Sequence, residues 1–226
     1  MTGRKVLLLV ASPRGMASTS NSLGAHLLSL LEERGMATKK LSLYPALADE
    51  KKMAEVLAAV DACDLLVAAF PLYVDQLPAP LIDLLLGIAE RRLGRQGDAR
   101  QAMAAIVNCG FPETVHCRPA AEIVRAFAAQ AGFRFLGCLA LGMGGAIGNR
   151  PLAKAGAMVR HQVKALSQAA PFLAEGAEIP EPVIALMGKA MMPRWFYNWM
   201  GDLGWKRAAK KNGTSGRLHD KPFPVE

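Results

Sequence analysis

The stretch "VLLLVASPRGMASTSNSLGAHLLSLL", residues 6–31, decides the fold of this chain. Its first residues are leucine and valine, which predict a buried strand, and its last residues repeat leucine at the spacing of a helix that Gly35 closes. Between them lies a loop of hydroxyl side chains, one glycine and one arginine. A strand, a polar loop and a helix in this order are typical of a βα unit.

The loop carries more polar side chains than a helix cap requires. One serine or asparagine is enough to cap a helix, so capping by Ser20 or Asn21 is the simpler interpretation of the segment. A helix N-terminus also offers unpaired N–H groups and partial positive charge, which favour a bound phosphate. We therefore predict a phosphate site here. Its candidate donors are Ser12, Arg14, Ser18, Thr19, Ser20, Asn21 and Ser22.

Two familiar nucleotide motifs are missing from this loop. GxxxxGK[ST] is absent, which disfavours hydrolysis of a nucleoside triphosphate, and so is GxGxxG, which disfavours a dinucleotide anchored there. The later segment "GMGGAIG", residues 142–148, has related glycine spacing. No further strand or acidic residue follows at the expected distance, so we expect its glycines to let the backbone turn or approach a ligand closely.

Strand and helix signals alternate along the first 175 residues. The alternation predicts an open parallel sheet with helices on both faces, whose ligands bind beyond the carboxyl ends of the strands. We expect a first domain over residues 1–175 and a C-terminal extension, partly helical, over residues 176–226. The predicted strands are residues 5–12, 37–44, 64–71, 101–110 and 133–142. The predicted helices are residues 21–35, 49–63, 80–94, 118–132 and one that begins at Pro151.

Composition narrows the class of protein. The chain has 226 residues, of which 52% are hydrophobic, enough for one sizeable core. No apolar run has the length of a membrane span and the N-terminus lacks a signal-peptide pattern, so we expect a cytoplasmic protein. The four cysteines form no CxxC pair, so a zinc site or a thioredoxin-like motif has little support. In a cytoplasmic protein we expect all four thiols to be reduced.

Two other loops follow predicted strands. "PLYVDQLPA" places Tyr73 between prolines, where its ring could stack on a planar ligand or pack at the entry to the next helix. "NCGFPETVHC" contains His116 and Cys117, but a Cys–His nucleophile also needs an orienting group and an oxyanion site. Neither has a strong candidate, so we predict no catalytic side chain.

At this point the chain resembles a known family. The runs "SPRGMASTSNSL", "PLYVDQLPAPL" and "NCGFPE", in this order and spacing, are similar to those of the flavodoxin-like NADPH-dependent FMN reductases and the flavodoxin-family NAD(P)H oxidoreductases. The resemblance covers roughly residues 4–150. It implies an α/β fold with a five-stranded parallel sheet of order 2-1-3-4-5, bound FMN, NADPH or NADH as electron donor, a small-molecule electron acceptor and a homodimer.

The resemblance also assigns roles to residues. The FMN phosphate would lie among Ser12, Arg14, Ser20, Asn21 and Ser22, with Ser18 as a further ligand. The isoalloxazine ring would be bordered by Pro71, Leu72, Tyr73 and Val74. Its other side would be closed by Asn108, Gly110 and Phe111, with Glu113 nearby.

The extension is aromatic and basic. All three tryptophans lie there, and residues 189–221 hold eight basic and two acidic residues, part of the formal net charge of +8. Packing on the first domain or on a second subunit is the favoured interpretation. Peripheral contact with an anionic membrane is an alternative, whereas no module surrounds the segment that would bind nucleic acid.

These observations lead to one preferred function and two alternatives. We expect an FMN-binding oxidoreductase that moves electrons from NAD(P)H to a small acceptor such as a flavin or quinone. An electron carrier or sensor with bound flavin and little NAD(P)H activity is the first alternative, although a net charge of +8 differs from the acidic character of flavodoxins. A domain of this fold that has lost its cofactor is the second.

Overall fold

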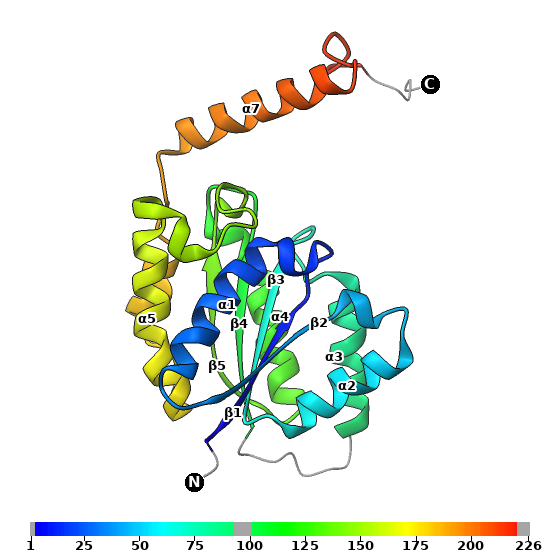
Figure 1. Ribbon diagram of the computed structural model, residues 1–226, viewed down its shortest axis with the longest axis vertical. Coiled ribbons are helices and arrows are strands. Elements are labelled where there is room, and N and C mark those ends of the chain that lie inside the picture. The colour runs from blue at the N-terminus through cyan, green and yellow to red at the C-terminus, as the bar shows by residue number, and fades with distance from the viewer. Residues whose placement is uncertain (1–2, 93–100, 221–226) are drawn as a thin grey trace. The chain divides into compact units, whose positions relative to one another are not determined.

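The computed structural model describes residues 3–92 and 101–220, and their strands form one parallel sheet. The strand order is β2-β1-β3-β4-β5, as expected (Figure 1). The strands are β1 (Lys5–Val10), β2 (Ala37–Ser42), β3 (Leu65–Pro71), β4 (Ala102–Asn108) and β5 (Arg134–Leu141). Because all strands are parallel, their carboxyl ends, and the loops that follow them, meet at one edge.

Helices cover both faces of the sheet, which confirms the predicted layers. Their bounds are α1 (Thr19–Glu32), α2 (Glu50–Ala62), α3 (Ala79–Arg92), α4 (Arg118–Gln130), α5 (Arg160–Glu175), α6 (Glu181–Met187) and α7 (Arg194–Lys211). Side chains alternate along β1: Leu7 and Leu9 pack toward α2, α3 and α4, whereas Val6 and Leu8 pack toward α1 and α5 (Figure 1). The strands are apolar on both sides because both faces of the sheet are buried.

The fifth helix begins later than predicted. The sequence pattern predicts its start at Pro151, but α5 starts at Arg160 and short 3-10 turns occupy the residues before it. Gly156 explains the difference, because its φ of +71° is left-handed and interrupts a right-handed helix. The last two residues of the predicted third helix, 93 and 94, lie outside the described residues.

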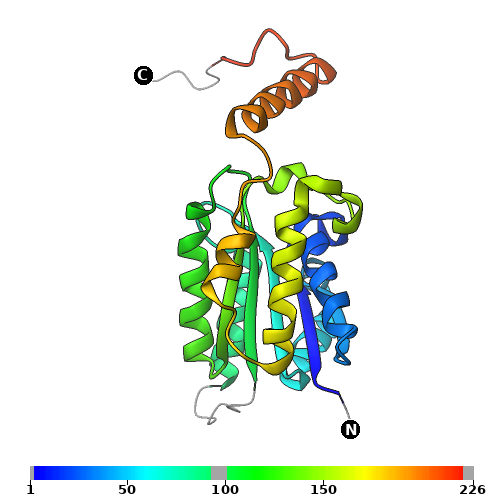
Figure 2. The ribbon, with the colours of Figure 1, turned by 90° about the vertical axis from the view of Figure 1, so that its left-hand side faces the viewer.

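The first unit extends beyond the predicted limit at residue 175. The chain divides into two compact units between Met191 and Met192. Residues 176–191, predicted as part of the extension, contribute to the core of the first unit because Ile179, Val183 and Met187 are buried there. Figure 2 shows α6 beside α5 and β5.

The second unit contains α7, so the extension is helical as expected. Trp195, Trp199 and Trp205 are all more than half exposed. A helix that lies on a membrane needs its apolar side chains on one face. The apolar side chains of α7 are instead distributed around the helix. Across the described ranges, no helix combines the length and the apolar character required to cross a membrane.

The packing of α1 on the sheet gives a stability prediction. A Cβ added to Gly24 would lie 2.7 Å from Leu8 Cδ1, and Leu8 is fully buried. Gly24→Ala should therefore lower the free energy of unfolding by about 1–3 kcal/mol, despite the better helix propensity of alanine. Chemical denaturation measures this change.

Gly87, inside α3, is the matched control. A Cβ there meets nothing within 4 Å. Gly87→Ala should raise the free energy of unfolding by up to about 1 kcal/mol. Equal shifts of the same sign in the two variants would contradict the proposed packing of α1 on β1.

Candidate functional site

The loop after β1 leads directly into the N-terminus of α1. A 3-10 turn, Gly15–Ala17, precedes the helix, and Ser18 caps it by accepting a hydrogen bond from the backbone N–H of Asn21 at 3.1 Å. The Ser18 hydroxyl also donates to the Gly15 carbonyl at 2.6 Å. The first N–H groups of the helix, those of Thr19 and Ser20, have no intrahelical acceptor and are available at this edge of the sheet.

Two side chains fasten the start of α1 to the neighbouring loops. The Thr19 hydroxyl lies 2.9 Å from the Gly144 carbonyl and 3.1 Å from that of Gly148, both in the loop after β5. The Asn108 amide donates to Ser20 Oγ at 2.9 Å and to the Phe70 carbonyl at 3.2 Å. Because Ser20 Oγ accepts from Asn108, its own proton remains available to a ligand.

The loop after β3 is a tight turn with an unusual backbone. Tyr73 and Gln76 exchange backbone hydrogen bonds of 3.0 and 2.9 Å. Between them, Val74 and Asp75 have φ values of +47° and +59°, as in a turn that normally contains asparagine and glycine. Val74 is β-branched and 95% exposed, so the turn holds a strained apolar side chain in solvent.

The loop after β4 contacts both of its neighbours. The Asn108 carbonyl accepts from the backbone N–H of Leu72 at 2.8 Å, and the Cys109 N–H donates to the Leu141 carbonyl at 2.9 Å. Phe111 is 53% exposed, and its ring centroid lies 4.3 Å from that of His116. These contacts bring the loops after β3, β4 and β5 together.

A cleft of about 240 Å³ opens where these four loops meet. Ten predicted site residues line it: Ser12, Arg14, Ser18, Thr19, Ser20, Pro71, Leu72, Tyr73, Asn108 and Gly110. Three others that were not in the predicted set also line it: Cys109, Gly144 and Gly145. Cys109 is a sequence neighbour of predicted residues, and the two glycines belong to the segment for which we expected close backbone approach.

The other five predicted site residues lie outside the cleft lining. Asn21 and Ser22 face a separate groove that also contains His26, and the Asn21 amide donates to the Met16 carbonyl at 2.8 Å. Val74 and Phe111 are exposed next to cleft residues. Glu113 directly precedes the short 3-10 helix Thr114–Cys117.

The chemistry of the cleft is that of a donor site. Its lining contains hydroxyls, an amide, backbone N–H groups and the Arg14 guanidinium, and no carboxylate. Ser12, Ser18 and Ser20 are nearly fully buried, whereas Arg14 is exposed at the rim. Such a set suits an anion, because each group can donate a hydrogen bond and no charge in the lining repels one.

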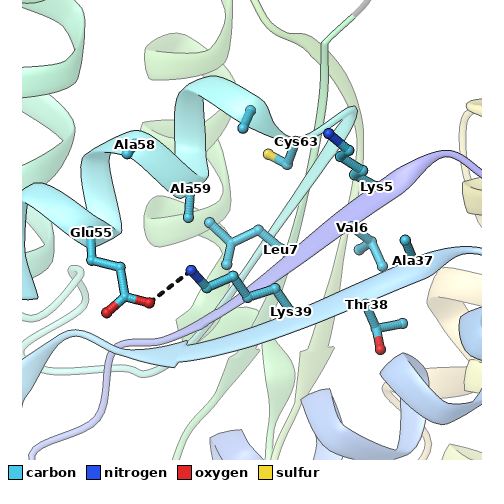
Figure 3. A pocket seen from close by; sticks show the side chains of 11 residues that line it. Lys5, Val6, Leu7, Ala37, Thr38, Lys39, Glu55, Ala58, Ala59 and Cys63 are labelled. Atoms are coloured by element: carbon cyan, nitrogen blue, oxygen red, sulfur yellow. Dashed lines mark ion pairs between the residues drawn. The ribbon is translucent and has the colours of Figure 1, made fainter. Parts of the chain in front are cut away.

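A larger hollow lies at the opposite edge of the sheet (Figure 3). It measures about 360 Å³ and lies between α2 and the amino ends of β1 and β2. Small side chains such as Ala58 and Ala59 leave the space, and Lys39 pairs with Glu55 at 2.7 Å beside it. This hollow is apolar and remote from the loops at which parallel sheets bind ligands, so the smaller cleft is the candidate site.

Comparison with known proteins supports the fold. No protein-family model matches the sequence, and no curated protein matches it. Three solved structures show the extent of the structural similarity. The Trp repressor binding protein from Bacillus subtilis has a TM-score of 0.54 at 14% identity over 72% of this chain and 96% of its own.

The other two structures are named as enzymes. An FMN-dependent NADH-azoreductase from Bacillus anthracis, in complex with FMN, has a TM-score of 0.55 at 15% identity over 76% of this chain and 100% of its own. A putative quinone reductase from Klebsiella pneumoniae has a TM-score of 0.55 at 16% identity over 79% of this chain and 88% of its own. At such identities the similarity establishes the fold, which is flavodoxin-like.

The strained turn gives the second prediction. Asparagine tolerates the left-handed backbone that valine resists, so Val74→Asn should raise the free energy of unfolding by about 1 kcal/mol. Thermal or chemical denaturation of the two proteins measures the gain. Val115 is also exposed, at 65%, and its φ is not positive. A similar gain in Val115→Asn would show that the effect comes from surface polarity rather than from strain.

Proposed function

We propose that this chain is an FMN-binding oxidoreductase that passes electrons from NADH or NADPH to a small acceptor. The observation that carries the proposal is the cleft at the carboxyl edge of the sheet. The loop after β1 and the start of α1 contribute hydroxyls and helix N–H groups to its lining, and the loop after β3 contributes Pro71, Leu72 and Tyr73. The first group suits a phosphate and the second suits a flat ring.

The residues present fit FMN. Gly110 lines the cleft, and a Cβ added to it would meet nothing within 4 Å, so the backbone leaves room for a ligand. Ser42 Oγ is buried without a hydrogen-bond partner among the described residues, and it lies 3.7 Å from the Cβ position of Gly15 in the phosphate loop. An unpaired polar atom beside a donor-rich loop is consistent with a polar ligand there.

The chain's own residues would bind and orient the cofactor. FMN, when bound, supplies the capacity to accept a hydride from NAD(P)H and to deliver electrons to an acceptor. The N–H groups of Thr19 and Ser20, the serine hydroxyls and Arg14 would hold its phosphate. Tyr73 and the turn after it would border the ring, beside a cleft of about 240 Å³. No acid or base from the protein is required.

Exposed side chains at the rim of the cleft offer a surface for the predicted homodimer. Tyr73, Val74 and Phe111 expose 46%, 95% and 53% of their surface in the single chain. A second copy placed over this rim would bury them and shield the outer face of a bound ring from water. The homodimer stays a prediction, and these three side chains are the surface that it would cover.

The phosphate assignment gives the third prediction. Arg14→Glu removes a charge-assisted contact worth about 1.5–3 kcal/mol and should weaken FMN binding about 10- to 100-fold. Riboflavin has the same ring without the phosphate, so its binding should change little. Titrations that follow flavin fluorescence measure both affinities.

Arg34→Glu is the matched control for charge. Arg34 follows the far end of α1, where it donates to the Leu30 carbonyl, and reversing it changes the net charge by the same amount. FMN binding should be unaffected in this variant. Equal weakening by the two reversals, or equal losses for FMN and riboflavin in Arg14→Glu, would exclude a phosphate beside Arg14.

The fourth prediction tests the reaction. When NADH or NADPH is added without oxygen to the FMN-loaded protein, the visible absorbance of oxidised flavin should be lost. A later addition of quinone should restore it. If the protein binds FMN and the absorbance persists with both nucleotides, the chain is an electron carrier or sensor. If no FMN binds, the chain is a flavodoxin-like domain without a cofactor.

A further inference from the structure

The wall of the cleft contains a thiol that the proposed flavin chemistry does not use. Cys109 lines the cleft directly after β4, and the residue as a whole is only 4% exposed. Its sulfur lies 3.6 Å from the Phe111 carbonyl and 3.5 Å from the Glu113 carbonyl. The loop of residues 110–113 therefore curls around this sulfur.

A second thiol lies against the first. The 3-10 helix Thr114–Cys117 returns the chain to the core, where Cys117 is fully buried. Both thiols belong to the same buried cluster, and the Glu113 carbonyl that Cys109 Sγ contacts directly precedes the short helix that ends at Cys117. The two thiols are close enough for each to shift the pKa of the other, and a disulfide would require their sulfurs to approach to about 2 Å.

We propose that Cys109 and Cys117 are a redox-active pair that hydrogen peroxide converts into an intramolecular disulfide. Cys109 is the thiol that the oxidant reaches, because it lines the cleft. Cys117, which is buried, is the resolving thiol that attacks the oxidised Cys109 sulfur. The reaction needs only the two thiols and peroxide, and Cys109 lines the same cleft that we propose for FMN.

The reaction balances in two steps. The Cys109 thiolate attacks one oxygen of the peroxide, the O–O bond breaks, and the departing oxygen leaves as water after it takes up a proton; Cys109 is then a sulfenic acid. The Cys117 sulfur attacks the Cys109 sulfur, the S–O bond breaks, and a second water leaves with the Cys117 proton. Hydrogen peroxide gains two electrons, and the two thiols lose two electrons and two protons.

The surroundings of the two sulfurs support this division of roles. The neighbouring Cys117 thiol lowers the pKa of Cys109, and the Phe111 backbone lowers it further, although burial opposes both. The same contact with Cys109, followed by burial, raises the pKa of Cys117. Cys109 is thus the better thiolate, and the thiolate is the attacking form.

The other two cysteines provide internal controls. Burial raises the pKa of Cys63 and of Cys138 to about 12, so both stay protonated at neutral pH. Neither lines the cleft. Cys138 is near enough to Cys117 to affect its titration, which makes a bond between those two the competing product.

A peptide map of the full chain tests the proposal. The reduced protein is treated with one equivalent of hydrogen peroxide, alkylated in denaturant and digested with trypsin. Trypsin does not cleave between Arg118 and Pro119, so Cys109 and Cys117 remain in one peptide, residues 101–125, whereas Cys138 lies in the peptide that begins at Phe135. A disulfide between Cys109 and Cys117 appears within a single peptide, and one with Cys138 joins two.

The expected result is a 101–125 peptide that carries no alkyl group and lacks two hydrogens. The free thiol count should fall from the four cysteines of the sequence to two, and dithiothreitol should restore it. Alkylation of both cysteines, a bond to Cys63 or Cys138, or sulfinic acid as the main product at Cys109 would overturn the proposal. This measurement on the unaltered chain does not depend on whether a variant folds.

Two variants sharpen the assignment. Cys117→Ser should leave a sulfenic acid at Cys109 that dimedone traps, because the resolving thiol is gone. Cys63→Ser should form the same disulfide as the unaltered chain. Trapping at Cys63 or Cys138 in place of Cys109 would show that the cleft does not direct the oxidant.

Discussion

The hydrogen bonds of the Asn108 amide are the contacts on which the candidate site depends. This one side chain joins the start of α1, through Ser20, to the end of β3, through the Phe70 carbonyl. Thr19 adds the loop after β5. All of these groups except Gly148, which is half-buried, are buried, so each lost bond between buried groups would leave a desolvated polar atom at a cost of about 1–3 kcal/mol. The helix N-terminus is therefore held in one position relative to three loops, and the direction of its N–H groups is set before any ligand arrives.

The sequence predicted the layers of the fold correctly, but it did not predict where α5 begins or where the first unit ends. Continuous apolar strands and alternating helices require a buried parallel sheet, whereas the strand order came from the resemblance. The start of α5 was missed because Pro151 suits a first helical turn and a single glycine, Gly156, breaks the run. Residues 176–191 were predicted to belong to the extension because the composition changes after the fifth predicted helix. Only the tertiary packing of Ile179 and Val183 reveals that they belong to the core.

The position of the helix cap explains the part of the site that sequence could not resolve. Residues 18–22 are all short and polar, so any of them could have begun the helix. Because Ser18 is the cap, Thr19 and Ser20 lie in the first turn at the edge of the sheet. Each later residue turns by about 100° around the helix axis, so Asn21 and Ser22 face the neighbouring groove. A shift of the cap by two residues, which local propensity alone would allow, would exchange these roles.

The hydrogen-bond donors, the strained turn after β3 and the Cys109 thiol all lie at the carboxyl edge of the sheet. One constraint explains why all three occur there. At the carboxyl ends of parallel strands the backbone leaves the sheet ladder, so its groups are satisfied by loop contacts that differ from strand to strand. The turn after β3 stays in a strained conformation because its ends are bound to each other. Cys109 is held by carbonyls of its own loop while remaining next to the cleft. The rigid sheet thus permits unfavourable local geometry at this edge, and such geometry places polar and reactive atoms where a ligand can meet them.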